Sequence, residues 1–173
     1  MDTPTHDGHA PTRTLPVRIN TIGTALFVVA EVVAVPWRSE RPAQVLIAVV
    51  SLVLFAMGVA TALWAYTSAL DRSRVHEVGV ANLFLLTGPT APAEVRRPMT
   101  VALAVQVVVG LGGAIVGSIG LDATSLNALA FGVLVPMLGI GMNGVWAARY
   151  GSFGPRLERA RGTRSSTSDS RNE

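Results

Sequence analysis

The chain contains no cysteine and no lysine, and charged residues make up only 14% of its 173 positions. The absence of cysteine excludes a disulfide framework, a thiolate nucleophile and a cysteine metal site. A soluble domain carries about 25% charged residues, and a disordered chain is polar rather than apolar. Here 50% of the residues are hydrophobic, and the mean hydropathy is +0.46. The composition therefore predicts a small integral membrane protein.

Four apolar segments are long enough to cross a bilayer as helices, which takes about 20 residues each. Glu31 is the only formally charged residue within them. This carboxylate, with no small-residue cleavage site after it, favours a retained first helix over a cleaved signal peptide. The pattern predicts an all-α fold, a four-transmembrane-helix bundle with disordered cytoplasmic tails. Its parts are a tail over 1–18, spans at 19–36, 45–70, 100–121 and 128–148, a cytoplasmic loop over 71–99 and a basic tail over 149–173.

Arginine is distributed unevenly around the predicted spans. Twelve arginines fall on the side that contains both termini and the central loop, and two, Arg38 and Arg41, fall on the other side. Cytoplasmic loops carry the excess of positive charge in membrane proteins. We therefore expect a multi-pass protein of the cell membrane with both termini in the cytoplasm. Anionic headgroups on that side are expected to contact the arginines near the span ends, which are Arg72, Arg74, Arg96, Arg97, Arg149 and Arg156.

Further apolar and aromatic residues are expected at the membrane surface. The stretch 78–86 is too short to span a bilayer, so we expect its large side chains to dip into the acyl boundary as an interfacial segment. These side chains are Leu83, Phe84, Leu85 and Leu86. The breaker-rich residues 88–94 predict an interruption before the third span. The three tryptophans are near span ends, where amphipathic rings prefer the interface; they are Trp37, Trp64 and Trp146.

Glu31 is the main candidate for a functional residue within the spans. An ionised carboxylate at the bilayer centre costs about 2.5 kcal/mol or more. Glu31 precedes Pro36 by five residues, so it lies about 7–8 Å from the outer edge of its span, within reach of water or of Arg38. Two interpretations stay open, a neutral or boundary-paired carboxyl and a proton- or cation-binding group. The first is favoured, because no second acid or histidine lies in any span to complete a relay.

The other notable residues within the spans predict helix packing. Gln106 and Asn143 lie at matching depth near the inner side, so their amides are expected to bond across helices, at about 0.6–2 kcal/mol. Gly113 and Gly117 form a GxxxG pair, which allows close helix approach within the bundle or in a dimer. Pro136 is expected to kink the fourth span, because it removes one helical hydrogen bond.

No motif for catalysis, a cofactor or a metal is evident. The chain has no phosphate-binding loop, HExxH or GxSxG motif, so neither an enzyme nor a cofactor is predicted. His6 and His9 beside Asp7 fit an unstructured tail better than a preorganised metal site. The pI near 10.5 reflects arginines that flank spans, so no nucleic-acid partner is expected. The sequence favours a non-enzymatic structural or accessory subunit with a membrane-protein partner or as a homo-oligomer. The alternative is a small proton- or cation-coupled transporter that uses Glu31.

Residues 78–106 and 131–156 resemble a group of small four-span integral membrane proteins from actinobacteria. The group has no assigned activity, so this resemblance implies a location and a topology rather than a chemistry. The layout is also similar to that of small multidrug resistance transporters, which have four spans and a glutamate in the first, the place that Glu31 takes here. The chain departs from that family in its 29-residue central loop, its long tails and its uneven arginine distribution, which argues against an antiparallel dual-topology dimer.

Overall fold

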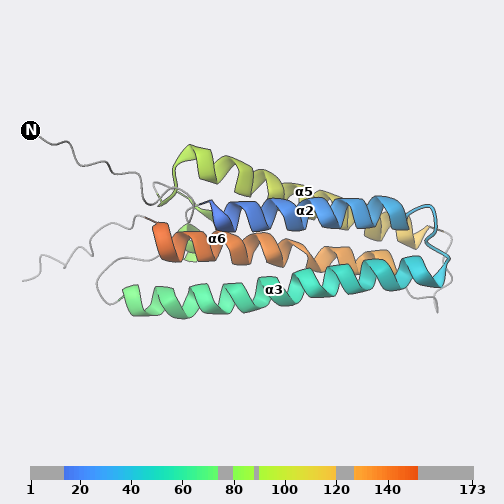
Figure 1. The fold of residues 1–173 in the computed structure, drawn as a ribbon, viewed down its shortest axis with the longest axis horizontal. Helices are drawn as coiled ribbons and strands as arrows, with labels where there is room; N and C mark the ends of the chain where they lie inside the picture. Colours follow the sequence, from blue (N-terminus) through green and yellow to red (C-terminus); the bar gives the residue numbers. More distant parts are fainter. Residues whose placement is uncertain (1–13, 74–79, 88–89, 120–126, 152–173) are drawn as a thin grey trace, which may run out of the picture.

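Four long helical segments run side by side in the computed structural model (Figure 1), which describes residues 14–73, 80–87, 90–119 and 127–151. Every regular element in these described ranges is a helix. The fourth segment is composite, because a 3₁₀ helix precedes its α-helix. The elements are α2 (Leu15–Ala34), α3 (Arg41–Ser73), α4 (Val80–Leu85), α5 (Ala93–Ser118), η2 (Ala128–Leu134) and α6 (Pro136–Tyr150).

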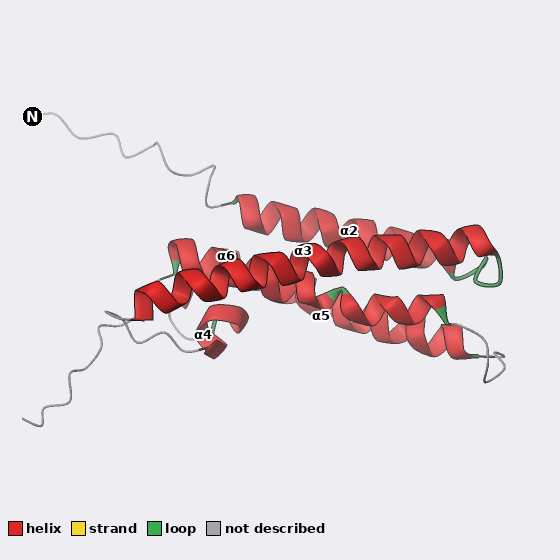
Figure 2. Ribbon diagram, turned by 90° about the horizontal axis from the view of Figure 1, so that it is seen from below, coloured by secondary structure: helices red, strands yellow, loops and turns green. Residues whose placement is uncertain are grey.

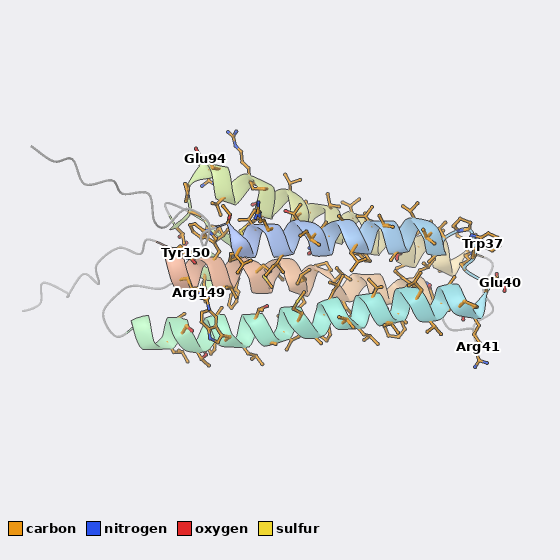
Figure 3. The ribbon with its side chains drawn as sticks, in the orientation of Figure 1. Trp37, Glu40, Arg41, Glu94, Arg149 and Tyr150 are labelled. Atoms are coloured by element: carbon orange, nitrogen blue, oxygen red, sulfur yellow. The ribbon has the colours of Figure 1, made fainter. Side chains whose placement is uncertain are left out.

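The four segments alternate in direction, so the bundle has two chemically distinct ends (Figure 3). At one end, here called the Trp37 end, α2 passes into α3 and α5 ends before η2 begins. At the other, the Tyr150 end, α6 ends and α5 begins. The connection at the Trp37 end is tight, because Glu40 N–H donates to the Trp37 carbonyl at 2.8 Å and the Gln44 side chain donates to the Arg38 carbonyl at 2.9 Å.

The expectation of an all-helical fold with four segments of spanning length is confirmed. Leu15–Ala34, Arg41–Leu70, Ala93–Ser118 and Ala128–Tyr150 are each long and apolar enough to cross a membrane. The helices extend beyond the apolar segments of the sequence, most clearly at α5, which begins seven residues before the expected span. Its first turns contain Arg96 and Arg97, since a helix end that reaches water tolerates charge.

Glycine allows the backbones to come close at two crossings. A Cβ on Gly58 of α3 would lie 2.5 Å from the Leu138 nitrogen of α6. A Cβ on Gly110 of α5 would lie 2.5 Å from the Gly132 carbonyl oxygen of η2. Any side chain at these two positions would push the helices apart, so the interior is narrow along the fourth segment.

The fourth segment changes its helix type at Pro136, where a kink was expected. Val135 N–H donates to the Gly132 carbonyl at 3.1 Å, and Leu138 N–H donates to the Val135 carbonyl at 2.8 Å, both in the i→i+3 pattern of a 3₁₀ helix. Pro136 then occupies the first turn of α6, where its missing N–H is not needed. The segment is therefore a discontinuous helix with a break inside the bundle.

Two expectations about the Tyr150 end need correction, although Leu85 is 52% exposed, as expected of an interfacial side chain. Leu83 and Leu86 do not face the acyl boundary, because α4 packs against α6 and leaves them 2% and 0% exposed (Figure 2). Trp146 is not an interfacial anchor, since it is 3% exposed and its ring packs against Tyr150 with centroids 5.9 Å apart. An apolar segment next to a helix end buries as much surface against protein as it would against lipid, and the sequence does not distinguish the two.

Candidate functional site

The inward face of α2 carries the polar residues of the interior. Asn20, Thr24, Phe27 and Glu31 are all buried, and their spacing of four, three and four residues places them in one stripe along the helix. The opposite face consists of exposed apolar residues, which suit contact with lipid. The outward residues are Ile22, Leu26, Val29, Val32 and Val33.

Glu31 lies inside the bundle near the Trp37 end. Its side chain is 3% exposed, and neither carboxylate oxygen has a hydrogen-bond partner among the described residues. The boundary pairing with Arg38 that the sequence allowed is therefore not formed. A buried carboxyl without a partner is unstable as a bare anion, so a proton or a cation must neutralise it.

Gly113 and Gly117 of α5 lack side chains, and polar groups of the interior occupy the space that side chains would fill. A Cβ on Gly113 would overlap Glu31 Oε1 and lie 2.6 Å from the carboxyl carbon. A Cβ on Gly117 would overlap the Asn127 amide, with 2.8 Å to its Cγ. Both glycines are buried within the bundle. The GxxxG pair thus makes room for polar side chains of the same chain, and does not present a dimer face.

Asn127, just before η2, brings a second polar group to the same face of α5. Its amide nitrogen donates to the Ala114 carbonyl at 2.8 Å. This bond fixes the orientation of the amide and leaves Oδ1 buried, with no hydrogen-bond partner in the part of the chain that the structure describes. Gly113 and Gly117 are one helical turn apart, about 6 Å, so the carboxyl of Glu31 and the amide oxygen of Asn127 lie at adjacent turns. We call Glu31, Asn127, Gly113 and Gly117 the carboxyl site.

A second polar cluster lies deeper along α2, around Gln106. Gln106 Nε2 donates to Thr24 Oγ1 at 2.7 Å and to Asn20 Oδ1 at 3.1 Å, and Gln106 Oε1 accepts the backbone N–H of Gly139 at 3.2 Å. Gln106 thereby links α2 and α5 and caps the first turn of α6 after the break at Pro136. The Asn20 Nδ2 group is buried without a partner.

The prediction that Gln106 and Asn143 bond to each other is wrong. Asn143 Nδ2 donates to the Phe84 carbonyl of α4 at 2.9 Å, and its Oδ1 has no partner among the described residues. Gln106 contacts Gly139 of α6, one turn before Asn143, but Asn143 itself binds α4, the short helix that the sequence predicted would lie at the membrane surface. Near it, a Cβ on Gly144 would lie 2.9 Å from both the Ala65 side chain and the Phe84 ring.

Phe27 separates the carboxyl site from the Gln106 cluster. Its ring is 0% exposed and lies against Gly132, where a Cβ would be 3.1 Å from Phe27 Cζ. Gly132 is at the close crossing with Gly110 of α5. Ser51 is also fully buried, and its hydroxyl has no partner in the described structure. Because Gly23 faces Leu54 in the antiparallel pair α2 and α3, Ser51 lies near the level of Phe27.

The arginines named as lipid contacts are at the Tyr150 end wherever the structure describes them. Arg97 is exposed on α5, and the Arg149 guanidinium lies over the Trp64 ring, 4.7 Å from its centroid. Arg72 is in the last turn of α3, and Arg96 is exposed on the first turn of α5. Arg74 and Arg156 lie outside the described residues, as do the histidines and Asp7 of the N-terminal tail.

Sequence reasoning identified Glu31, Gly113 and Gly117 but missed Asn20, Thr24, Phe27 and Asn127. The signal for the first three was present, because they share the α2 stripe with Glu31. No group of three or more histidine, cysteine or acidic residues that could hold a metal occurs among the described residues. Comparisons with protein families, with curated proteins and with solved structures find no match for this chain.

Proposed function

We propose that this chain is a small proton- or cation-coupled transporter of the cell membrane, with Glu31 as its ion-binding carboxyl. The observation that carries the proposal is the burial of this carboxyl at 3% exposure with both oxygens unpartnered. A structural carboxyl in an apolar bundle would be expected to have a hydrogen-bond donor or a cation beside it. A carboxyl that lacks one is suited to exchange a proton or a cation with the solvent.

The interior supports this function because two polar regions are separated by an apolar layer. The carboxyl site lies toward the Trp37 end, the Gln106 cluster lies toward the Tyr150 end, and Phe27 separates them. Transport requires that a bound ion reach one side at a time, which a closed layer between two polar regions provides. The discontinuous fourth segment passes this layer, and breaks of this kind mark binding sites in other membrane transporters.

We further propose that the Trp37 end faces outward and that both termini are cytoplasmic, as the arginine distribution favours. In this orientation Glu31 lies closer to the outer side than to the inner side. No enzymatic step, cofactor or nucleic-acid partner is part of the proposal, and the arginines of the Tyr150 end would contact anionic headgroups.

Ion flux in proteoliposomes tests the proposal. The full chain is reconstituted, and uptake of protons, sodium and potassium is followed under an imposed gradient with a fluorescent indicator. Flux is expected with the wild type and expected to be lost with Glu31→Gln, which keeps the shape and removes the charge. Glu40→Gln is the matched control, because Glu40 is exposed at the same end of the bundle (Figure 3). Equal flux in Glu31→Gln and wild type, or no flux at all, would contradict it.

The second candidate is the structural or accessory subunit that the sequence favoured. The observation in its favour is an exposed apolar surface on α3, formed by Val45, Leu46 and Val49 beside Arg41 and Pro42. A partner helix would fit such a surface. A stoichiometric membrane protein that co-purifies with the wild type and is lost with Val49→Trp would support this candidate. Purification of the chain alone as a symmetric oligomer would count against it.

A further inference from the structure

We propose that the carboxyl site binds a monovalent metal cation, with Glu31 and Asn127 as its protein ligands. This inference rests on the proposed function, since both need Glu31 as an ion-binding group. It adds the second ligand and the class of ion. Asn127 was not identifiable from the sequence, and its amide oxygen is the further acceptor that a metal cation would use.

The first argument is the nature of the unpartnered atoms. Glu31 contributes two oxygens and Asn127 one, and none of the three has a hydrogen-bond partner among the described residues. All three are acceptors, and the Asn127 nitrogen is already committed to the Ala114 carbonyl. A proton on Glu31 makes one carboxyl oxygen a donor, which can pair with one other acceptor and leaves the third oxygen unpartnered, whereas one cation can contact all three oxygens. Carboxylate and amide oxygens are typical ligands of hard metal cations.

The second argument is the space that the glycines leave. Gly113 and Gly117 lie on one face of α5, and a side chain at either would occupy the volume now taken by the polar groups. The two positions are about 6 Å apart along the helix. A cation with ligand distances of about 2.3–2.6 Å bridges oxygens that are at most about 5 Å apart, so the proposal requires the Glu31 and Asn127 oxygens to lie closer together than the two glycine positions do.

The third argument is charge balance. Glu31 contributes one negative charge, and the described parts of α3, α5, η2 and α6 have no charged side chain at its level. Among the described residues, the charged ones nearest to Glu31 along the chain are Arg38, Glu40 and Arg41, all exposed beyond the end of α2. One positive charge makes the buried cluster neutral, whereas a divalent ion would leave an uncompensated charge in an apolar interior. The site therefore favours a monovalent ion.

The carboxyl site lies closer to the Trp37 end than to the Tyr150 end. Glu31 is five residues from Pro36, about 7–8 Å along the helix axis, and Asn127 directly precedes η2 at the same end. On the opposite side Phe27 and the crossing of Gly110 with Gly132 close the interior. Because Glu31 is 3% exposed, a cation would have to enter through a movement at the Trp37 end, where the distance to the surface is shorter.

Salt-dependent thermal stability of the purified full chain tests the inference. Unfolding in detergent is followed in sodium, potassium or lithium chloride against choline chloride at the same ionic strength, in alkaline buffer. One of the metal ions is expected to raise the midpoint in the wild type, and Glu31→Gln is expected to abolish this effect. Asn127→Ala is expected to weaken the apparent affinity about tenfold, the equivalent of one lost ligand bond of about 1.4 kcal/mol.

Two further variants keep the test decisive. Asn143→Ala removes a buried amide at the opposite end of the bundle, so it is expected to lower the midpoint and leave the cation effect unchanged. Asn127→Asp adds a second negative charge, and is expected to shift the preference from the monovalent ion toward calcium. The inference is overturned if Asn127→Ala binds the cation as tightly as the wild type, or if Asn143→Ala weakens the binding equally.

The outcome also separates this inference from the proposed function. No cation effect in the wild type, together with proton flux that Glu31→Gln abolishes, would leave the proposed function in place and refute the metal site. No cation effect and no flux would refute both.

Discussion

Replacing Gly113 with alanine tests the arrangement of the carboxyl site against a neighbouring position. Gly112 and Gly113 are adjacent on α5, but a Cβ on Gly112 meets nothing within 4 Å, whereas one on Gly113 overlaps Glu31 Oε1. In both variants alanine favours the helix by about 0.5–1 kcal/mol. The helix contribution therefore cancels when the two are compared.

The remaining difference between the variants is the cost of displacing the Glu31 carboxyl. Overpacking of a well-packed interior costs about 1–3 kcal/mol. We expect Gly113→Ala to be less stable than Gly112→Ala by this amount, and to lose the cation effect and the flux as well. Reversible unfolding in mixed detergent micelles measures the first quantity. Equal stability of the two variants, with ion binding retained in Gly113→Ala, would refute the placement of the carboxyl against α5.

Three further predictions concern the Gln106 cluster, the Phe27 layer and the orientation of the chain in the membrane. Gln106→Ala removes the acceptor of the Gly139 N–H and the donor to Thr24 Oγ1 and Asn20 Oδ1, and it is expected to lower the free energy of unfolding by about 1–3 kcal/mol in the same assay; an unchanged value would exclude a stabilising network. Phe27→Ala removes the closed layer, so faster ion leak into proteoliposomes is expected at equal protein density, and a tight vesicle would contradict the layer. Cysteine introduced at Ser39 should react with an impermeant maleimide in intact cells and cysteine at Ser73 should not; the reverse pattern would overturn the orientation.

The helices of this fold were predictable because length and apolar composition set them locally. The packing partners of these helices were harder to predict. Gln106 and Asn143 were placed at matching depth, but depth does not say which way a side chain points around the helix. Gln106 faces α2 and α6, and Asn143 faces α4. The prediction that they bond to each other was wrong because the rotation of each helix about its axis is set by tertiary contacts, which depth along the helix does not give.

The candidate site shows the same division between local and tertiary information. Glu31 stood out as the one charge within the spans, and the α2 stripe could have revealed Asn20 and Thr24 by spacing. Asn127 could not be found in this way, because it follows the third helix in a connection whose geometry the sequence does not specify. The GxxxG pair was read as a surface for another helix, since glycines that accommodate a polar side chain have the same spacing as glycines that accommodate a backbone.

Chemical labelling of Glu31 tests the central claim, that this carboxyl exchanges an ion inside the bundle, most directly. An apolar carbodiimide reacts with protonated carboxyls in an apolar environment, and mass spectrometry locates the adduct. We predict an adduct at Glu31 in membranes at acidic pH, none at the exposed Glu40, and slower labelling as metal cation is added. Absence of labelling at Glu31 at any pH, or labelling of Glu31 and Glu40 to the same extent, would contradict the account.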